Sequence, residues 1–238
     1  MQSLLKTRHI FRREFKAYFI SPIAYIVISI FLLIIGWMFF STFFFSGQAN
    51  LSNFFELLPL SFSFIIPAVT MRLFSEEINV GTYEILFTLP VTSRDIILGK
   101  FLAAVAFVGL MLTPTLVYAI TTAFLGQLDW GPVIGGYVGA MLLGASFCAV
   151  GLLASSLTRN QVIAFIIGMT ICFSLTMMID FVLYFLPDAL VKVFQYFSAN
   201  FHFKNIAKGV VDTRDILYFL SVMFIALYLS AFIMKEKK

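Results

Sequence analysis

The sequence predicts an all-α polytopic membrane protein with six transmembrane helices, an N-terminal amphipathic interface helix and short external re-entrant helices. Of its 238 residues, 61% are hydrophobic and 12% are charged, whereas soluble domains carry about 45–50% apolar and about 25% charged residues. Several long stretches contain no Asp, Glu, Lys or Arg, and a spanning helix needs about 20 mostly apolar residues. These stretches lack the polar–apolar alternation of barrel strands, so helices are the spanning elements that remain.

The expected spans belong to one domain, residues 1–238. We place them at about 23–45, 54–74, 96–124, 133–157, 162–186 and 216–234, from the length that a spanning helix needs. The second span contains Pro59 and Pro67. Because proline frees a backbone carbonyl that a neighbour must satisfy, we expect a kinked or broken helix there.

Basic residues predict that both termini lie on the cytoplasmic side, because short cytoplasmic loops are enriched in Lys and Arg. The side with the termini carries Lys6, Arg8, Arg12, Arg13, Lys16, Arg72, Arg94, Lys100, Arg159, Lys235, Lys237 and Lys238. The opposite side carries only Lys192, Lys204, Lys208 and Arg214.

The N-terminal segment, residues 1–21, is amphipathic. Its apolar face at helical spacing consists of Leu4, Leu5, Phe11, Phe15, Tyr18 and Phe19. Its basic residues, on the other side and the flanks, are Lys6, Arg8, Arg12, Arg13 and Lys16. Such a helix fits the cytoplasmic headgroup layer, with Ser21-Pro22 stopping or bending it. Two interpretations stay open: a membrane-surface anchor, or a lever that moves with a cytosolic motor.

The loop of residues 75–95 is a polar island between two spans. Gly81 is expected to end one helix and Thr82 to start a short one, with an apolar side supplied by Tyr83, Ile85, Leu86 and Phe87. Its negative charge comes from Glu76, Glu77 and Glu84. Pro90 forces a break, and Thr92-x-x-Asp95 is close to a capping box at the next helix start. The alternative is a solvated acidic hairpin.

The outer loop, residues 187–213, mixes aromatic and basic side chains, which favours short helices at the outer interface. Asp180, near the outer end of the fifth span, is a possible pathway residue, since carboxylates inside membranes are often functional; the alternative is that it reaches headgroup water. Gly135-x-x-x-Gly139 allows close helix packing, within one chain or between two.

No motif for chemistry is present. The sequence has no Gly-x-x-x-x-Gly-Lys-Ser/Thr phosphate loop and no zinc-protease or nucleophile-elbow motif. His9 and His202 are isolated, so no metal-ligand spacing exists, while Cys148 and Cys172 lie in apolar stretches typical of buried thiols. We expect no catalytic residue, metal or cofactor in this chain and no nucleic-acid partner. Any uphill transport then takes its energy from another protein.

Three segments resemble the permease subunit of type-2 ABC transporters, an exporter family. They are the stretch Glu76 to Val91, the continuation Ile96-Ile97-Leu98-Gly99-Lys100 and the turn Ser155 to Gln161. Within that family, Asp129 to Tyr137 is similar to permeases of the gliding-motility-associated and copper-enzyme-maturation groups.

The resemblance implies a half-transporter in the bacterial cytoplasmic (inner) membrane that pairs with a second permease chain, as a homo- or heterodimer. Two ABC ATPase subunits, which bind ATP and Mg, would dock from the cytosol. The residues implied in ATPase coupling are Glu76, Glu77, Gly81, Thr82, Tyr83, Glu84 and Pro90. The interface helix, with Arg8, Arg12, Arg13 and Lys16, would contact membrane lipid, and Val193 to Lys204 would form the re-entrant helices.

Two other functions stay open from the sequence. An ATP-driven mechanical or regulatory complex that transports no cargo would use the same coupling loop. A channel or scaffold without an ATPase would have no need for it. The apolar, aromatic spans favour a lipid-like, peptide or polymer cargo over small ions.

Overall fold

The computed structural model describes residues 2–46, 50–81, 92–183, 185, 191, 194–210 and 212–236. Within these residues the chain forms helices and no strand, and six helices are long and apolar enough to cross a membrane. The predicted fold class, an all-α polytopic membrane protein, is therefore confirmed. The α-helices are α1 (Gln2–Ile20), α2 (Pro22–Ser46), α3 (Ser52–Thr70), α4 (Arg72–Val80), α6 (Ser93–Leu112), α7 (Leu116–Leu125), α8 (Trp130–Leu157), α9 (Gln161–Phe173), α10 (Ile179–Leu183), α12 (Ala199–Ala207) and α13 (Thr213–Glu236).

Two short segments of other helix types interrupt the spans. A 3-10 turn, η1 (Thr113–Thr115), joins α6 to α7 at Pro114, and a π-helical turn, η2 (Ser174–Met178), joins α9 to α10. π turns inside α-helices occur frequently at functional sites. In η2 the hydroxyl of Thr176 lies 3.1 Å from that of Ser63 on α3.

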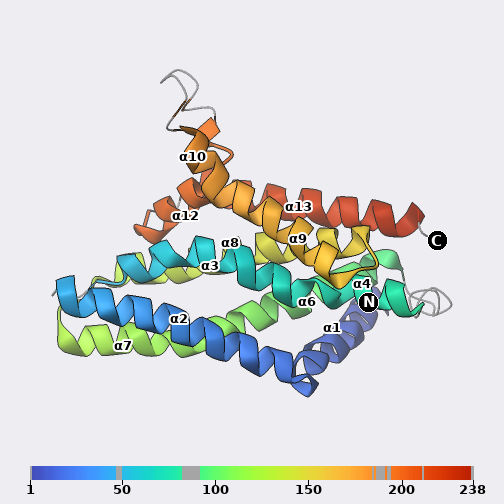
Figure 1. The fold of residues 1–238 in the computed structure, drawn as a ribbon, viewed down its shortest axis with the longest axis horizontal. Coiled ribbons are helices and arrows are strands. Elements are labelled where there is room, and N and C mark those ends of the chain that lie inside the picture. Colours follow the sequence, from blue (N-terminus) through green and yellow to red (C-terminus); the bar gives the residue numbers. More distant parts are fainter. Residues whose placement is uncertain are drawn as a thin grey trace.

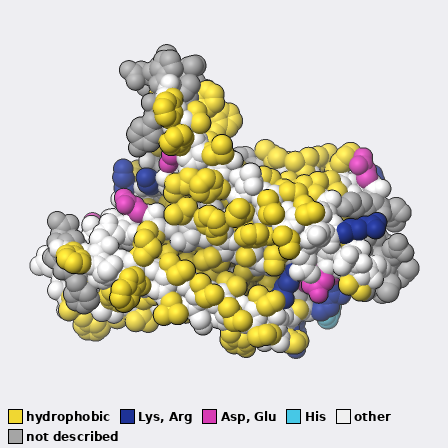
Figure 2. Space-filling view, in the orientation of Figure 1, with side chains coloured by type: hydrophobic (Ala, Val, Ile, Leu, Met, Phe, Trp, Pro, Cys, Tyr) yellow, Lys and Arg dark blue, Asp and Glu magenta, His cyan; other side chains and the backbone are white. Residues whose placement is uncertain are grey.

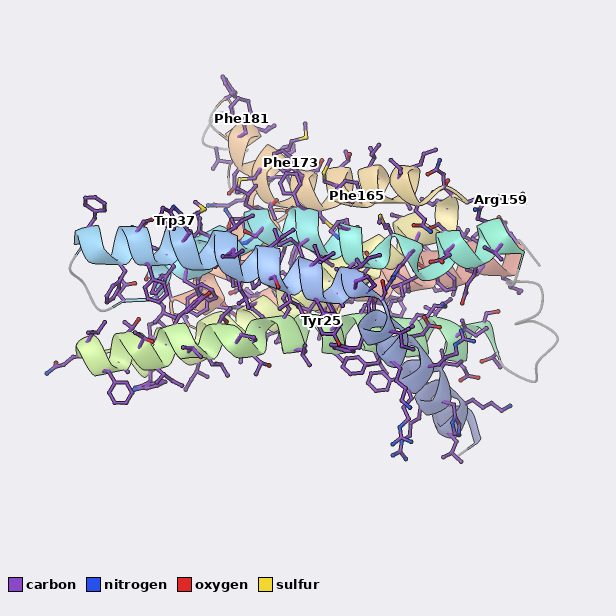
Figure 3. All side chains as sticks on the ribbon, turned by 60° about the horizontal axis from the view of Figure 1, so that its bottom comes forward. Tyr25, Trp37, Arg159, Phe165, Phe173 and Phe181 are labelled. Atoms are coloured by element: carbon purple, nitrogen blue, oxygen red, sulfur yellow. The ribbon has the colours of Figure 1, made fainter. Side chains whose placement is uncertain are left out.

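The long helices run side by side and give the molecule two ends (Figure 1). The α1 end holds α1, α4 and both marked chain termini, and the α12 end holds α12, α10 and the start of α13. Arg159 lies at the α1 end, and Phe165, Phe173 and Phe181 follow α9 and α10 out toward the other end (Figure 3). Hydrophobic side chains cover most of the surface between the ends, and charged side chains gather near them (Figure 2).

Local sequence explains where several helices begin and end. Helix α1 stops at Ile20 because Pro22 disfavours a helical residue before it, and Pro22 then opens α2. Helix α4 ends at Gly81, whose φ of 78° is left-handed, as the sequence predicts. The capping box predicted at Thr92 and Asp95 is present at the start of α6.

Helix α8 is the centre of the bundle and the most buried of the six long helices. It packs against α3, α6, α9, α12 and α13. Small residues allow this, because membrane helices approach closely only where side chains are short. A Cβ on Gly135 would overlap the carbonyl oxygen of Ile206 on α12, and a Cβ on Gly139 would lie 3.2 Å from the Ile206 side chain. The Gly135-x-x-x-Gly139 pattern therefore packs helices within one chain.

Candidate functional site

Four charged side chains at the α1 end form a closed set of ion pairs, which we call the ion ring: Arg13 and Glu14 of α1, Glu77 of α4 and Lys100 of α6. The Lys100 ammonium lies 2.8 Å from Glu77 and 3.3 Å from Glu14. The Arg13 guanidinium lies 2.7 Å from Glu14 and 3.3 Å from Glu77. Each cation thus contacts both carboxylates, and three helices from separate parts of the sequence meet in one neutral cluster.

Lys100 is the buried member of the ion ring. Its side chain is 1% exposed, against 53% for Arg13. Besides the two carboxylates it donates a 2.7 Å hydrogen bond to the Leu73 carbonyl oxygen, and its ammonium lies 5.2 Å from the centre of the Phe74 ring. A buried ammonium is tolerated only when it is paired and hydrogen-bonded. Helix α4 supplies most of these partners, so Lys100 ties α4 to α6.

The ion ring shifts the pKa values of its two α1 members, Glu14 and Arg13. Burial by itself raises the pKa of Glu14, but Lys100 and Arg13 outweigh it and keep this pKa below its ordinary value. For Arg13, burial lowers the pKa, and the hydrogen bond and charge of Glu14 together with the charge of Glu77 raise it above its ordinary value. The contacts within the ring therefore favour the charged forms of Arg13 and Glu14.

Close packing of α1 against α6 brings the ring together. A Cβ on Gly99 would lie 2.7 Å from the Ile10 side chain and 3.2 Å from the Thr7 carbonyl oxygen, so the two helices touch where Gly99 has no side chain. The Thr7 hydroxyl also donates to Asp95, 3.4 Å away. Part of the apolar face that the sequence assigns to the headgroup layer, including Phe11 and Phe15, is packed against the protein core.

A second connection joins α4 to α8 through Ser155. The start of α4 has no side-chain cap from its own N-cap residue, Met71. Instead the Ser155 hydroxyl accepts from the backbone N–H groups of Phe74 and Ser75, at 2.9 and 3.0 Å, and donates to the Met71 carbonyl at 2.8 Å. Ser155 therefore caps α4 from another helix and fixes the start of α4 against the centre of the bundle.

The structure separates the residues that the sequence predicts for ATPase coupling. Glu77 enters the ion ring, its neighbour Glu76 is exposed, and Gly81 ends α4. The other four, Thr82, Tyr83, Glu84 and Pro90, lie outside the described residues. On α1, Arg13 belongs to the ring, and the exposed side chains are Arg8, Arg12 and Lys16.

Asp180 is remote from the ion ring. It lies in α10 at the α12 end, where the Ser198 hydroxyl and the Asn200 amide each donate to its carboxylate over 2.6 Å. The structure thus gives Asp180 protein partners beside α12, and it does not bring this residue together with the predicted coupling residues.

Sequence reasoning missed Glu14, Lys100 and Ser155 as members of the site. Lys100 counted only as a marker of orientation, because a charge at the end of an apolar stretch is typical of every span boundary. One signal was available: Lys100 lies next to Gly99 in a stretch already singled out, and a glycine inside a helix often marks a close backbone approach.

The arrangement is suited to transmit movement. Helices α1, α4, α6 and α8 are joined by ion pairs and hydrogen bonds at the point where α4 leads into residues 82–91. These contacts tie α4 to two of the long helices, α6 and α8.

Comparison with known proteins identifies the family of this chain. No match was found among curated proteins. A family model described as "ABC-2 family transporter protein" matches residues 8–229, which includes the ion ring and nearly the whole chain. Together with the six apolar helices, this match shows that the chain belongs to the ABC-2 family of transporter proteins, as a permease subunit of an ABC transporter.

Proposed function

We propose that this permease couples ATP hydrolysis by its ABC ATPase partners to export of a substrate, and that the ion ring transmits the coupling movement. One observation carries the proposal. Glu77 lies one turn before Gly81, where α4 ends and the predicted coupling segment begins, and it is tied to the nearly fully buried Lys100 of the third long helix. A movement of that segment cannot displace α4 without moving or breaking this pair.

The energetics favour movement over breakage. Removing one partner of a buried ion pair leaves an uncompensated charge and costs about 3–5 kcal/mol. When residues 82–91 are displaced, α4 therefore draws α6 along through Lys100 and α1 through Arg13 and Glu14. Ser155 adds α8 to the same unit. ATP and Mg bind in two partner ATPase subunits, which supply the displacement.

In this proposal the α1 end faces the cytoplasm of a bacterial cell and the α12 end faces outward. The exposed basic residues of α1, Arg8, Arg12 and Lys16, support this orientation, because each basic residue near anionic lipid contributes about 1 kcal/mol. A second permease chain completes the pathway. Apolar cargo fits the composition of the long helices better than small ions.

The test is affinity purification of the tagged chain from its native membrane in mild detergent, followed by an ATPase assay on the eluate. We compare wild type with Glu77→Gln and with the control Glu236→Gln, which removes an exposed carboxylate at the end of α13, outside the coupling residues. We expect a stoichiometric ATPase partner in all three preparations. ATPase turnover of the eluate falls at least about tenfold in Glu77→Gln, which corresponds to 1.4 kcal/mol or more of lost coupling, and stays near wild type in the control.

Two outcomes would overturn the proposal. If the chain purifies without any nucleotide-binding protein, the proposed ATPase partner is ruled out. Equal ATPase turnover in Glu77→Gln and Glu236→Gln, with intact assembly, rules out a role of the ion ring in coupling.

A further inference from the structure

Two polar contacts, one part-buried and one buried, hold the short helix α12 at the α12 end. Helix α12 packs on α8 and contacts α3, η2 and α13, and it lies beside α10 and the start of α13 (Figure 1). One contact joins it to α10 through Asp180, with Ser198 and Asn200 as neutral donors. The other joins it to α13, and its chemistry is different.

The contact with α13 is a buried His202–Asp215 pair. The imidazole Nδ1 lies 2.6 Å from the Asp215 carboxylate, and Nε2 lies 3.0 Å from the Tyr196 carbonyl oxygen. The His202 and Asp215 side chains are 3% and 4% exposed. The imidazole also stacks on the Tyr218 ring with 4.2 Å between centroids, and the Tyr218 hydroxyl donates to the Phe197 carbonyl over 2.7 Å.

Both ring nitrogens of His202 therefore face acceptors. A carboxylate and a carbonyl oxygen cannot donate, so both contacts are satisfied only when the imidazole carries two N–H groups or shares its second proton with Asp215. Loss of that proton leaves a nitrogen lone pair against an oxygen atom in a buried site. An unsatisfied buried polar contact of this kind is costly.

Few other groups can stabilise Asp215 once the proton is lost. Its second carboxylate oxygen, Oδ2, has no hydrogen-bond partner within the described part of the chain. Among the described residues, the titratable groups that contact His202 are Asp215 and Tyr218 of α13 and Tyr196 before α12. The basic residues nearby in sequence, Lys204 and Arg214, are exposed, and in the described structure neither forms an ion pair with Asp215.

We propose that His202 and Asp215 form a proton-dependent clasp that fastens α12 to the start of α13 when the pair holds its shared proton and releases α12 when the proton leaves. The hydrogen bonds determine the direction of the pH dependence: the clasp is closed in mildly acidic medium and opens as pH rises. Histidine is the side chain that proteins most often use as a proton-dependent switch near neutral pH. The Asp180 contact contains no histidine, since its donors are the neutral Ser198 and Asn200.

The test measures hydrogen–deuterium exchange of the α12 peptide in the full-length protein in lipid nanodiscs. Exchange is recorded at about pH 5.5 and about pH 8.5, on either side of the histidine range, and is corrected for the intrinsic pH dependence of amide exchange. In wild type we expect the protection of α12 to fall at least about tenfold at the higher pH, since loss of one proton shifts an equilibrium up to tenfold per pH unit.

Three variants distinguish proton-dependent release of α12 from a general loss of its protection. His202→Phe keeps the stack on Tyr218 but holds no proton, so α12 is weakly protected at both pH values. Asp215→Asn presents either an amide or a carbonyl to Nδ1, which satisfies neutral and charged imidazole alike, so α12 is protected at both. Asp180→Asn, the matched control at the other contact, lowers protection but keeps the pH dependence.

Equal protection of wild-type α12 at the two pH values overturns the proposal. So does a pH dependence that survives in both His202→Phe and Asp215→Asn. Because Asp215→Asn retains the hydrogen bonds of the site, it also reports on the clasp if His202→Phe fails to fold.

Discussion

The two ends of the bundle are held by buried charges of different kinds. At the α1 end, the ion ring pairs a lysine and an arginine with two carboxylates. At the α12 end, the clasp depends on one histidine. Lysine and arginine stay charged across the physiological range, and histidine does not. The α1 end is therefore built as a permanent connection, and the α12 end as one that solution conditions can release.

The strongest test of this contrast is removal of the buried cation in Lys100→Met. We expect unfolding to be easier by about 3 kcal/mol, the lower part of the range for a broken buried ion pair, because Glu14 and Glu77 are 12% and 18% exposed. Thermal unfolding in detergent measures the change.

The companion variant removes the three more buried charges of the ring and leaves the exposed Arg13, with Lys100→Met, Glu14→Gln and Glu77→Gln combined. Replacing a whole buried ion cluster by neutral groups is often close to neutral for stability, so most of the lost stability should return. If the triple variant is as unstable as Lys100→Met alone, the loss comes from packing of the lysine stem and not from charge.

A smaller effect is expected from Gly99→Ala, which adds one methyl group where α1 touches α6. Its Cβ would lie 2.7 Å from Ile10, so we expect a loss of about 1–3 kcal/mol from overpacking. Gly109→Ala is the control in the same helix, because its Cβ would meet only Met141, at 3.5 Å. Alanine favours helix over glycine by about 1 kcal/mol, so the control should gain stability. Equal unfolding temperatures for the two variants would show that α1 does not depend on the Gly99 contact.

The smallest expected effect is the pH dependence of the contacts that hold each end, which has opposite signs at the two ends. The pKa of Glu14 is lowered in the folded protein from an ordinary value of 4.5, so its contribution to stability is present above that value and is lost as pH falls through the folded pKa. The ion ring thus loosens in acid, whereas the clasp opens as pH rises. Accessibility of a label at Lys16→Cys should rise below about pH 4, beneath the usual carboxylate range, and Glu14→Gln should remove that step. Label accessibility that stays constant down to the lowest pH measured would contradict the role of the ion ring in holding α1.

Much of the fold could be predicted because the signals are local. Apolar length predicts the long helices, Pro22 and Gly81 mark helix ends, and the Thr92–Asp95 box marks a start. Each of these depends on a few neighbouring residues, so a single sequence is sufficient.

The sites could be predicted only in part, because their contacts join distant residues. Glu77 was singled out, but its partner Lys100 is 23 residues away and Ser155 is about 80 residues from the amides it caps. His202 looked isolated because its partner, Asp215, lies 13 residues further on, in another helix. Pairing at such separations follows from helix packing, and the glycines of α8 that permit the packing do not reveal which side chains they bring together.

The central claim is that the ion ring makes α1 and α4 move as one unit when ATP binds, and spin-label distances test it most directly. Labels at the exposed positions Lys16, Asn79 and Lys235 report on α1, α4 and α13, and the native Cys148 and Cys172 are buried. In the complex with its ATPase, the Lys16–Asn79 distance should stay constant between nucleotide-free and ATP-bound states while the Lys16–Lys235 distance changes. A Lys16–Asn79 distance that changes as much as Lys16–Lys235, or no ATP-dependent change in either, would contradict the account.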